Sequence, residues 1–213
     1  MNLEIVRLTL GPLPNNVYLL GDRDSGDAVV IDPSYDSHKV LTRVESLGWT
    51  LRQIWLTHAH FDHIAGAAEL AAAFDPPLPI GLNVRELDWY HNEGGAGMFG
   101  LSIQQPPEPS ILFEQGMQLS LEPGGETAAE VLLAPGHSLG HVMFYCADLD
   151  ALICGDVIFR EGIGRTDLEG GNMAELVKSI REKVFTLPDE TRLLPGHGPE
   201  STVGHEKEFN PFL

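Results

Sequence analysis

The sequence predicts an α/β fold of four layers, αββα, in which two sheets pack on each other and helices cover their outer faces. Short aliphatic strands followed by helical patterns occupy the first half of the chain, and the same order recurs in the second half at similar length. No segment of linker composition separates the halves, so we expect a single domain over residues 1–213. Because 43% of its residues are hydrophobic, the chain can bury a substantial core.

Turn residues separate the predicted elements of the first half. The strands are short and aliphatic, and the first helix has an apolar stripe with helical spacing. An alanine-rich helix ends at Asp75-Pro76, since the residue before proline disfavours helix. The predicted strands are Leu3–Leu10, Val17–Leu20, Ala28–Ile31 and Gln53–Thr57, and the predicted helices are Ser37–Leu47, Ile64–Phe74 and Val84–His91.

The second half repeats this pattern after an irregular stretch, residues 92–110, that is rich in Gly and Pro. A loop of this length is typical of a lid or binding loop, and a disordered surface excursion is the alternative. Asn172 and Glu175 form a capping-box arrangement at the start of one helix. The predicted strands are Met117–Leu121, Ala129–Leu133, His141–Cys146, Ala151–Cys154 and Arg192–Leu194, and the predicted helix is Met173–Phe185.

The charge balance restricts the partners of this chain. Thirteen basic and 31 acidic residues give a formal charge of −18, which repels nucleic acid and anionic membranes, so we expect neither as a partner. No apolar run is long enough to cross a bilayer. The first residues lack the features of a signal peptide, so we expect a cytoplasmic protein. Two cysteines are too few for a disulfide scaffold.

Metal-ligand residue types are concentrated in the segment Thr57-His58-Ala59-His60-Phe61-Asp62-His63. Residues two apart on extended chain point to the same side, so His58, His60 and Asp62 can converge. His63 is expected to open the next helix and to approach from a different backbone element. Imidazole nitrogens and carboxylate oxygens suit zinc, iron or manganese.

Three further candidate ligands, His137, Asp156 and His197, each follow a short aliphatic strand and a glycine. If these strands and the one before His58 lie side by side and run the same way, their ligands gather at one sheet edge. Another histidine, His141, is predicted to be a core residue, and a position behind the metal ligands is its alternative role.

Seven ligands exceed the needs of one zinc ion and fit two metals that share a bridging carboxylate. We expect zinc, with iron or manganese as alternatives. Such two-metal sites hold a water molecule that becomes hydroxide near neutral pH. The expected division is His58, His60 and His137 on one metal, Asp62, His63 and His197 on the other, and Asp156 between them.

These motifs resemble those of the metallo-β-lactamase superfamily over nearly the whole chain, and the resemblance implies an αββα sandwich with a metal site at one edge. Three further segments resemble the short form of the glyoxalase II-type thioester hydrolases. This second resemblance implies hydrolysis of S-D-lactoylglutathione or a related acyl thioester. The segments are Gly-Asp-Val-Ile-Phe-Arg at 155–160, Gly-Arg-Thr-Asp at 164–167 and Pro-Gly-His-Gly-Pro-Glu-Ser-Thr at 195–202.

The predicted reaction is attack of a metal-bridging hydroxide on a thioester carbonyl, with Asp62 and Asp156 as the catalytic carboxylates. A thiolate leaves readily, so no strong general acid is needed. Asp32 and Thr57 are candidates for orienting the ligands. Arg160 and Arg165 are candidates for substrate contact, and Arg165 has pairing with the neighbouring Asp167 as its alternative role.

Longer glyoxalase II enzymes carry a C-terminal helical region with basic residues that hold glutathione. This chain ends sixteen residues after His197, so we expect a different or weaker grip on glutathione. The main alternative is a persulfide dioxygenase, which resembles this chain at the 57–63 and 164–167 segments and uses one iron held by two histidines and an aspartate. A lactonase remains a further alternative, and β-lactam hydrolysis is the least favoured.

Overall fold

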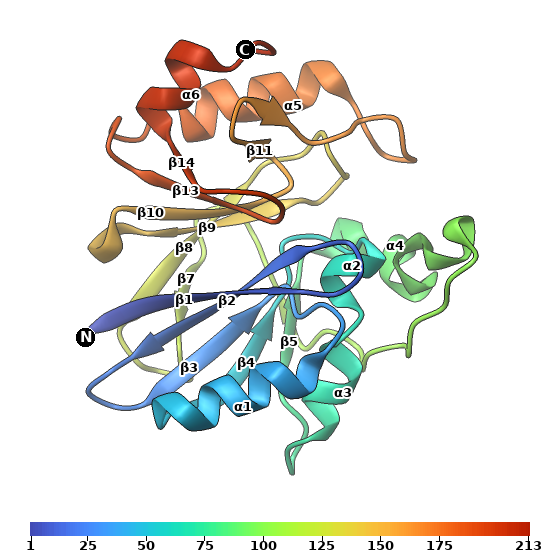
Figure 1. Ribbon diagram of the computed structural model, residues 1–213, viewed down its shortest axis with the longest axis vertical. Coiled ribbons are helices and arrows are strands. Elements are labelled where there is room, and N and C mark those ends of the chain that lie inside the picture. The colour runs from blue at the N-terminus through green and yellow to red at the C-terminus, as the bar shows by residue number, and fades with distance from the viewer.

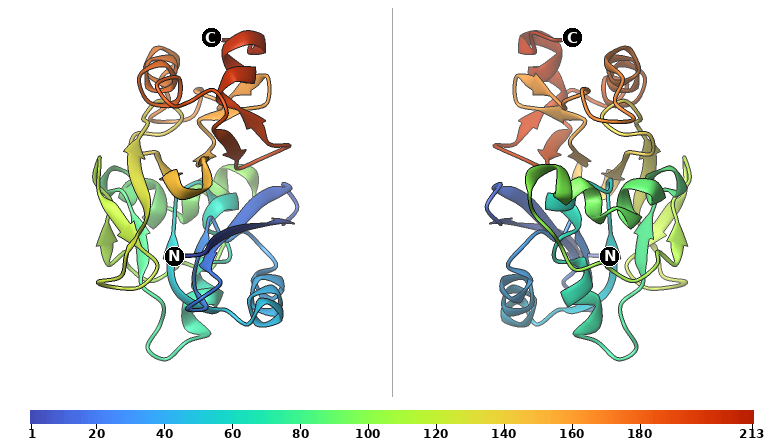
Figure 2. Two further views of the ribbon diagram at one scale, coloured as in Figure 1. Left: turned by 90° about the vertical axis from the view of Figure 1, so that its left-hand side faces the viewer. Right: turned by 90° about the vertical axis from the view of Figure 1, so that its right-hand side faces the viewer.

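Two six-stranded sheets face each other in the middle of the molecule, and helices cover the outer face of each (Figure 1). The computed structural model describes all residues, 1–213. Views from the two sides show the same stack of helix, sheet, sheet and helix (Figure 2). The predicted four-layer αββα fold is therefore confirmed.

The first sheet contains the N-terminal strands in sequence order. Antiparallel pairing joins its first three strands, and parallel pairing joins the third to the sixth. Helix α1 (Ser37–Leu47) makes the crossover between the first two parallel strands. The strands are β1 (Leu3–Leu10), β2 (Asn15–Asp22), β3 (Asp27–Ile31), β4 (Thr50–Trp55), β5 (Ile80–Leu82) and β6 (Ile111–Leu112).

The second sheet has the order β14-β13-β10-β9-β8-β7. Its pairs are antiparallel except for β10 and β13, which are parallel and are connected through a helical segment. A short hairpin of β11 (Ile158–Phe159) and β12 (Gly162–Ile163) follows β10. The strands are β7 (Gln118–Ser120), β8 (Thr127–Leu133), β9 (Val142–Cys146), β10 (Ala151–Gly155), β13 (Arg192–Pro195) and β14 (Ser201–Thr202).

Alternation of side chains along the strands divides the core into three apolar layers. In β3, Val29 and Ile31 point toward the second sheet, whereas Val30 packs under the helices of the first. Leu152 and Leu193 of the second sheet contact Leu176 of the covering helix. Because each sheet is apolar on both faces, each must be covered on both, which produces four layers.

The alanine-rich segment departs from its prediction. Instead of one helix over Ile64–Phe74, the chain forms α2 (Phe61–Ile64) and α3 (Ala67–Ala72). Gly66 separates them, and a Cβ atom there would lie 2.2 Å from the carbonyl oxygen of Ser34. This close approach of two backbone segments interrupts the helix.

Two other predicted helices are present with altered geometry. The first half of Val84–His91 is a 3₁₀ turn, η1 (Val84–Glu86), and the rest is α4 (Leu87–His91). The capped helix begins as predicted, with the Asn172 side chain accepting the Glu175 N–H at 3.1 Å. It runs as α5 (Met173–Ser179) and continues as a π-helical turn, η4 (Ile180–Val184).

Elements of two or three residues were absent from the predictions, because so short a segment shows no periodicity. They are β5, β6, β11, β12, β14 and the turn η3 (Ala147–Leu149). The last helix, α6 (Val203–Phe209), was not predicted either. The irregular stretch 92–110 begins with a 3₁₀ segment, η2 (Glu93–Phe99). None of the helices has the length and apolar character that crossing a bilayer requires.

Candidate metal centre

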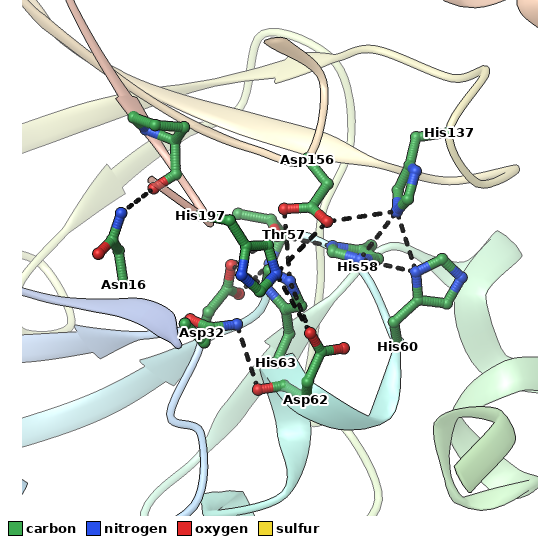
Figure 3. A network of polar contacts seen from close by, with 12 residues as sticks. Asn16, Asp32, Thr57, His58, His60, Asp62, His63, His137, Asp156 and His197 are labelled. Atoms are coloured by element: carbon green, nitrogen blue, oxygen red, sulfur yellow. Dashed lines mark hydrogen bonds and ion pairs between the residues drawn. The ribbon is translucent and has the colours of Figure 1, made fainter. Parts of the chain in front are cut away.

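The candidate ligands lie together in the chain segments that follow four strands (Figure 3). His58 and His60 are in the loop after β4, Asp62 and His63 are in α2, and the other three follow β8, β10 and β13. The expectation that these strands lie side by side in one sheet is wrong. Strand β4, which precedes His58, belongs to the first sheet, whereas β8, β10 and β13 belong to the second, where β9 separates β8 from β10. The site forms instead where the ends of the two facing sheets meet.

Three histidines converge in what we call the three-histidine pocket: His58, His60 and His137. The Nε2 atom of His58 lies 3.1 Å from Nδ1 of His60 and 3.2 Å from Nε2 of His137, and the last two atoms are 2.9 Å apart. Nitrogens bound to one tetrahedral zinc at 2.0–2.1 Å lie about 3.4 Å from one another. The three ring nitrogens are therefore spaced like ligands of a single ion.

A second group, which we call the mixed pocket, contains Asp62, His63 and His197. The Nε2 atom of His197 lies 3.2 Å from Oδ2 of Asp62, and Nε2 of His63 lies 3.9 Å from the same oxygen. Asp62 does not join His58 and His60, because α2 already begins at Phe61 and turns the carboxylate away from the direction an extended chain would give it. The structure therefore brings these side chains together in the same two groups as the expected division, and their role as metal ligands stays a prediction.

Asp156 lies between the two pockets (Figure 3). Its Oδ1 atom is 3.4 Å from Nε2 of His63, and its Oδ2 atom is 3.7 Å from Nε2 of His197 and 3.8 Å from Nε2 of His137. One carboxylate therefore faces histidines of both pockets, as a bridging ligand must.

Hydrogen bonds on the outer side of four imidazoles fix their tautomers. Carbonyl oxygens only accept, so His137 and His197 carry their hydrogens on Nδ1 and present the Nε2 lone pair to the pockets. The Thr57 hydroxyl donates its hydrogen to the carboxylate of Asp32, so it can only accept a hydrogen from His58. His58 therefore also carries its hydrogen on Nδ1. The Nδ1 partners are Thr57 Oγ1 for His58 (2.9 Å), Asp32 Oδ2 for His63 (3.0 Å), the Arg165 carbonyl for His137 (2.8 Å) and the Pro14 carbonyl for His197 (3.0 Å).

Asp32 organises two of these imidazoles from behind. Its Oδ1 accepts the Thr57 N–H at 2.7 Å, and its Oδ2 accepts both the Thr57 hydroxyl at 2.7 Å and the Nδ1–H of His63 at 3.0 Å. Through Thr57 the same carboxylate also reaches His58. The structure thus places Asp32 and Thr57 where the sequence predicted them, in contact with ligand histidines.

The residues present fit divalent metal ions. The buried Nε2 of His63 and Oδ1 of Asp156 have no hydrogen-bond partner within the chain, and a cation would satisfy both. A Cβ atom on Gly196 would lie 2.3 Å from Oδ1 of Asp156 and 2.6 Å from Cε1 of His63. Glycine is therefore needed for the chain before His197 to pass this close to the ligands.

The two pockets differ in protonation. Burial, together with the neighbouring imidazoles, holds the pKa of His58 well below its usual value and lowers the pKa of His60 to about 3. Burial acts in the same direction on His63, but the carboxylates of Asp156 and Asp62 outweigh it and raise the pKa of His63 well above its usual value. In the metal-free chain the three-histidine pocket is therefore uncharged at neutral pH, and the mixed pocket retains protons.

A cavity of about 640 Å³ opens onto both pockets. Apolar side chains make much of its wall, and Gly94 and Phe99 show that the irregular stretch 92–110 contributes to it. The apolar wall residues are Leu13, Phe61, Trp89, Phe99, Phe159, Ile163 and Leu168. This stretch thus has the position expected of a binding loop.

The two arginines have different surroundings. Arg165 lines the cavity, but its guanidinium makes two 2.8 Å hydrogen bonds to the carboxylate of Asp167, as the alternative role predicted. Arg160 lines a separate polar hollow with Arg192 and His205. The structure therefore does not place Arg160 against the cavity, because the chain turns away into the β11–β12 hairpin after Val157.

Two further residues contribute to the site. His141 is fully buried, as predicted for a core histidine, and it also has the alternative role of supporting the ligands: its Nε2 accepts the backbone N–H of Asp156 at 3.1 Å, and its ring stacks on His58 with ring centroids 4.7 Å apart. Asn16 donates its side-chain amide to the carbonyls of Pro195 and Gly198, at 3.0 and 2.8 Å, and so holds the loop that carries His197. Asn16 was not predicted to support the site. The only sequence feature that pointed to it was a polar asparagine at the start of a buried strand.

Residues 10–197 match the Metallo-beta-lactamase superfamily, and the chain belongs to this family. Among curated proteins it is 40% identical over 210 residues to a Bacillus subtilis (strain 168) protein named "Probable metallo-hydrolase YqgX", covering 97% of this chain and 96% of that one. It is 34% identical over 214 residues to "Hydroxyacylglutathione hydrolase GloC" of Haemophilus influenzae, covering 100% and 98% of the two chains.

Solved structures of the same fold include two with substantial sequence identity. TTHA1623, crystallised in a di-iron-bound form, superposes with a TM-score of 0.87 at 39% identity and covers 98% of this chain and 100% of its own. BLEG-1, described as a B3 metallo-beta-lactamase, superposes with a TM-score of 0.90 at 35% identity and covers 99% of both chains. These likenesses agree with a His/Asp cluster that binds divalent metals.

Proposed function

We propose that this protein is a metal-dependent hydrolase of acyl thioesters, with S-D-lactoylglutathione or a related hydroxyacyl-glutathione as substrate. The observation that carries the proposal is the set of four imidazoles with Nδ1 held from behind, so that Nε2 of each faces one of the two pockets beside Asp156. Such an arrangement fixes which ring nitrogen is offered to a metal.

The ligands divide between two ions in this proposal. When bound, two divalent ions lower the pKa of a water molecule and polarise a carbonyl oxygen. Zinc is the first choice for a set of imidazole and carboxylate donors, and iron, the metal in the TTHA1623 structure, and manganese are the alternatives. The proposed division is His58, His60 and His137 for the first ion, Asp62, His63 and His197 for the second, and Asp156 for both.

The chain's own residues bind and orient the reactants. Although burial opposes it, His63 and His197 lower the pKa of Asp62, and His63 does the same for Asp156, so both carboxylates are ionised at neutral pH. They can therefore accept hydrogens from a water molecule and orient it toward the acyl carbon. In the net reaction water adds to that carbon, the carbon–sulfur bond breaks, and an acid and a thiol leave.

The cavity wall supports a substrate with an apolar stretch near the reacting bond. Trp89 packs against His60 and Phe159 lies beside His197, and Phe99 also lines the cavity, so these rings would exclude bulk water from the acyl group. The similarity to the relative named hydroxyacylglutathione hydrolase is the reason for choosing glutathione as the first thiol to test.

A second candidate function is hydrolysis of β-lactams, favoured by the likeness to BLEG-1. A third, oxidation of glutathione persulfide at a single iron, requires only one occupied pocket. We would assay purified protein of measured metal content against S-D-lactoylglutathione, simple acyl thioesters, lactones and β-lactams, and would follow oxygen uptake with glutathione persulfide. Release of free thiol with two ions per chain supports the proposal, whereas oxygen uptake with one iron, or turnover of β-lactams alone, contradicts it.

A further inference from the structure

One more buried carboxylate lies beside the three-histidine pocket, outside the proposed ligand set. Glu86, the last residue of η1, is only 1% exposed. Its Oε2 accepts the backbone N–H of Ala59 at 3.0 Å, and its Oε1 accepts the backbone N–H of Gly140 at 2.6 Å. Ala59 stands between His58 and His60, so the carboxylate grips the loop that carries two of the three histidines.

The two gripped loops belong to different sheets. One backbone hydrogen bond joins them, from the N–H of Val142 to the carbonyl of Thr57 at 2.8 Å. In an antiparallel pair the same register would next bring Ala59 opposite Gly140. At that position both N–H groups donate to the Glu86 carboxylate instead of to the carbonyl of the opposite residue. The Glu86 carboxylate therefore connects the two loops at the position where direct backbone pairing between them has ended.

The segment that presents Glu86 is itself held firmly. Asn83 accepts the N–H of Arg85 at 3.0 Å and donates its amide to the carbonyl of Phe113 at 2.9 Å. A Cβ atom on Gly140 would lie 2.5 Å from Oδ1 of Asn83 and 2.9 Å from Cβ of Arg85. Glycine is required for the loop to reach this segment, and the carboxylate acts from a fixed platform.

We propose that Glu86 is a positioning residue that sets the geometry of the three-histidine pocket by spacing the loop of His58 and His60 from the loop of His137. Its buried negative charge also favours a divalent cation in a pocket that has no carboxylate of its own. The inference rests on the proposed function to the extent that these histidines are metal ligands.

Glu86→Gln tests the role with little change of shape. The amide can accept one of the two backbone N–H groups but turns a donor toward the other, and it removes the charge. Glu206→Gln is the matched control. Glu206 is also fully buried, and it accepts from the Glu161 N–H at 2.9 Å and the Asn210 amide at 2.8 Å, on α6, away from both pockets.

Stepwise titration of each metal-free protein with cobalt(II), followed by visible absorption, reads the two pockets separately. The titration step that is lost in the His137→Ala variant is assigned to cobalt binding in the three-histidine pocket. In Glu86→Gln we expect this step to be at least tenfold weaker, as for other residues that support metal ligands, with a changed spectrum and an unchanged second step. Glu206→Gln should bind in both steps like the wild type. Wild-type behaviour of Glu86→Gln, or equal weakening of both steps, would overturn the role.

Amide hydrogen exchange of the wild-type protein keeps the inference testable if Glu86→Gln does not fold. Ala59 and Gly140 should exchange slowly although both lie in loops, and rapid exchange at either would overturn the proposed contacts. Both experiments measure metal binding or amide exchange and not catalysis. If the protein had no thioesterase activity, only the proposed substrate would be wrong, and the role of Glu86 could still be tested. Unchanged cobalt binding in Glu86→Gln would remove only the role of Glu86.

Discussion

The three-histidine pocket and the mixed pocket lie on either side of Asp156 but hold their ligands by different means. The first has neutral imidazoles from both sheets, all nearly inaccessible to solvent. The second has a carboxylate ligand of its own, and its His197 side chain is 30% exposed. The mixed pocket offers a cation a carboxylate of its own, whereas the three-histidine pocket depends on accurate placement of uncharged groups. The two sites should therefore respond differently to substitution and to pH.

The largest expected effect comes from the one residue the pockets share. Asp156→Ala removes the carboxylate that faces histidines on both sides, so both ions lose a ligand. We expect thioester hydrolysis to fall about 10⁴-fold or more, the scale seen when one member of a group that acts as a unit is removed. Steady-state kinetics and metal analysis after dialysis check this. An Asp156→Ala protein with two ions and full rate would show that the pockets are independent of it.

Two matched substitutions, one in each pocket, test whether the pockets bind their ions independently. His137→Ala and His197→Ala each remove one histidine that follows a strand and a glycine, one from each pocket. We expect each variant to retain one ion per chain and to lose most activity, because the reaction needs both. Metal analysis by plasma emission measures the stoichiometry. If either variant lost both ions or kept both, the division of ligands between pockets would be wrong.

A smaller, selective effect is expected behind the mixed pocket. Asp32→Asn places an amide where the carboxylate now accepts the Nδ1–H of His63 and the Thr57 hydroxyl. The imidazole loses its orientation and part of its basicity, so affinity for the second ion should fall about 10–100-fold. Calorimetric titration of metal-free protein gives the affinity of each step. Equal loss in both steps would indicate that Thr57 transmits the change to His58.

The pH dependence of metal loading should also differ. In the metal-free chain the pKa of His63 is raised and the pKa of His197 is raised, so these residues take up protons at higher pH and the protons compete with the ion. The pKa values of His58 and His60 are lowered, so these imidazoles stay neutral as the pH falls. Between pH 8 and pH 6 we expect affinity to fall more steeply in the mixed pocket. Parallel slopes in titrations at several pH values would contradict this difference.

The seven candidate ligands could be found from the sequence because they concentrate in one short segment or follow a strand and a glycine. The arrangement of the strands that precede these ligands could not be predicted. Strands β4 and β10 are both short and contain aliphatic residues, and long-range pairing decides which sheet each one joins. The alternation of an extended chain allowed Asp62 to converge with His58 and His60, because nothing in the sequence marks the start of α2 at Phe61.

The supporting residues were harder to predict than the ligands. His141 has the composition context of a core histidine, and only the folded chain brings its ring to the backbone of Asp156. Glu86 lies in the predicted helix Val84–His91, where nothing in the sequence marks it as buried, and its two partners are distant in sequence. Residues that act through backbone groups carry no side-chain motif, so the sequence indicates candidate ligands more readily than the residues that position them.

Anomalous diffraction from crystals of the metal-loaded protein locates each bound ion. We expect two peaks per chain, one among His58, His60 and His137 and the other among Asp62, His63 and His197, with the Asp156 carboxylate in contact with both. A single peak, or a second ion bound outside the mixed pocket, would contradict this expectation.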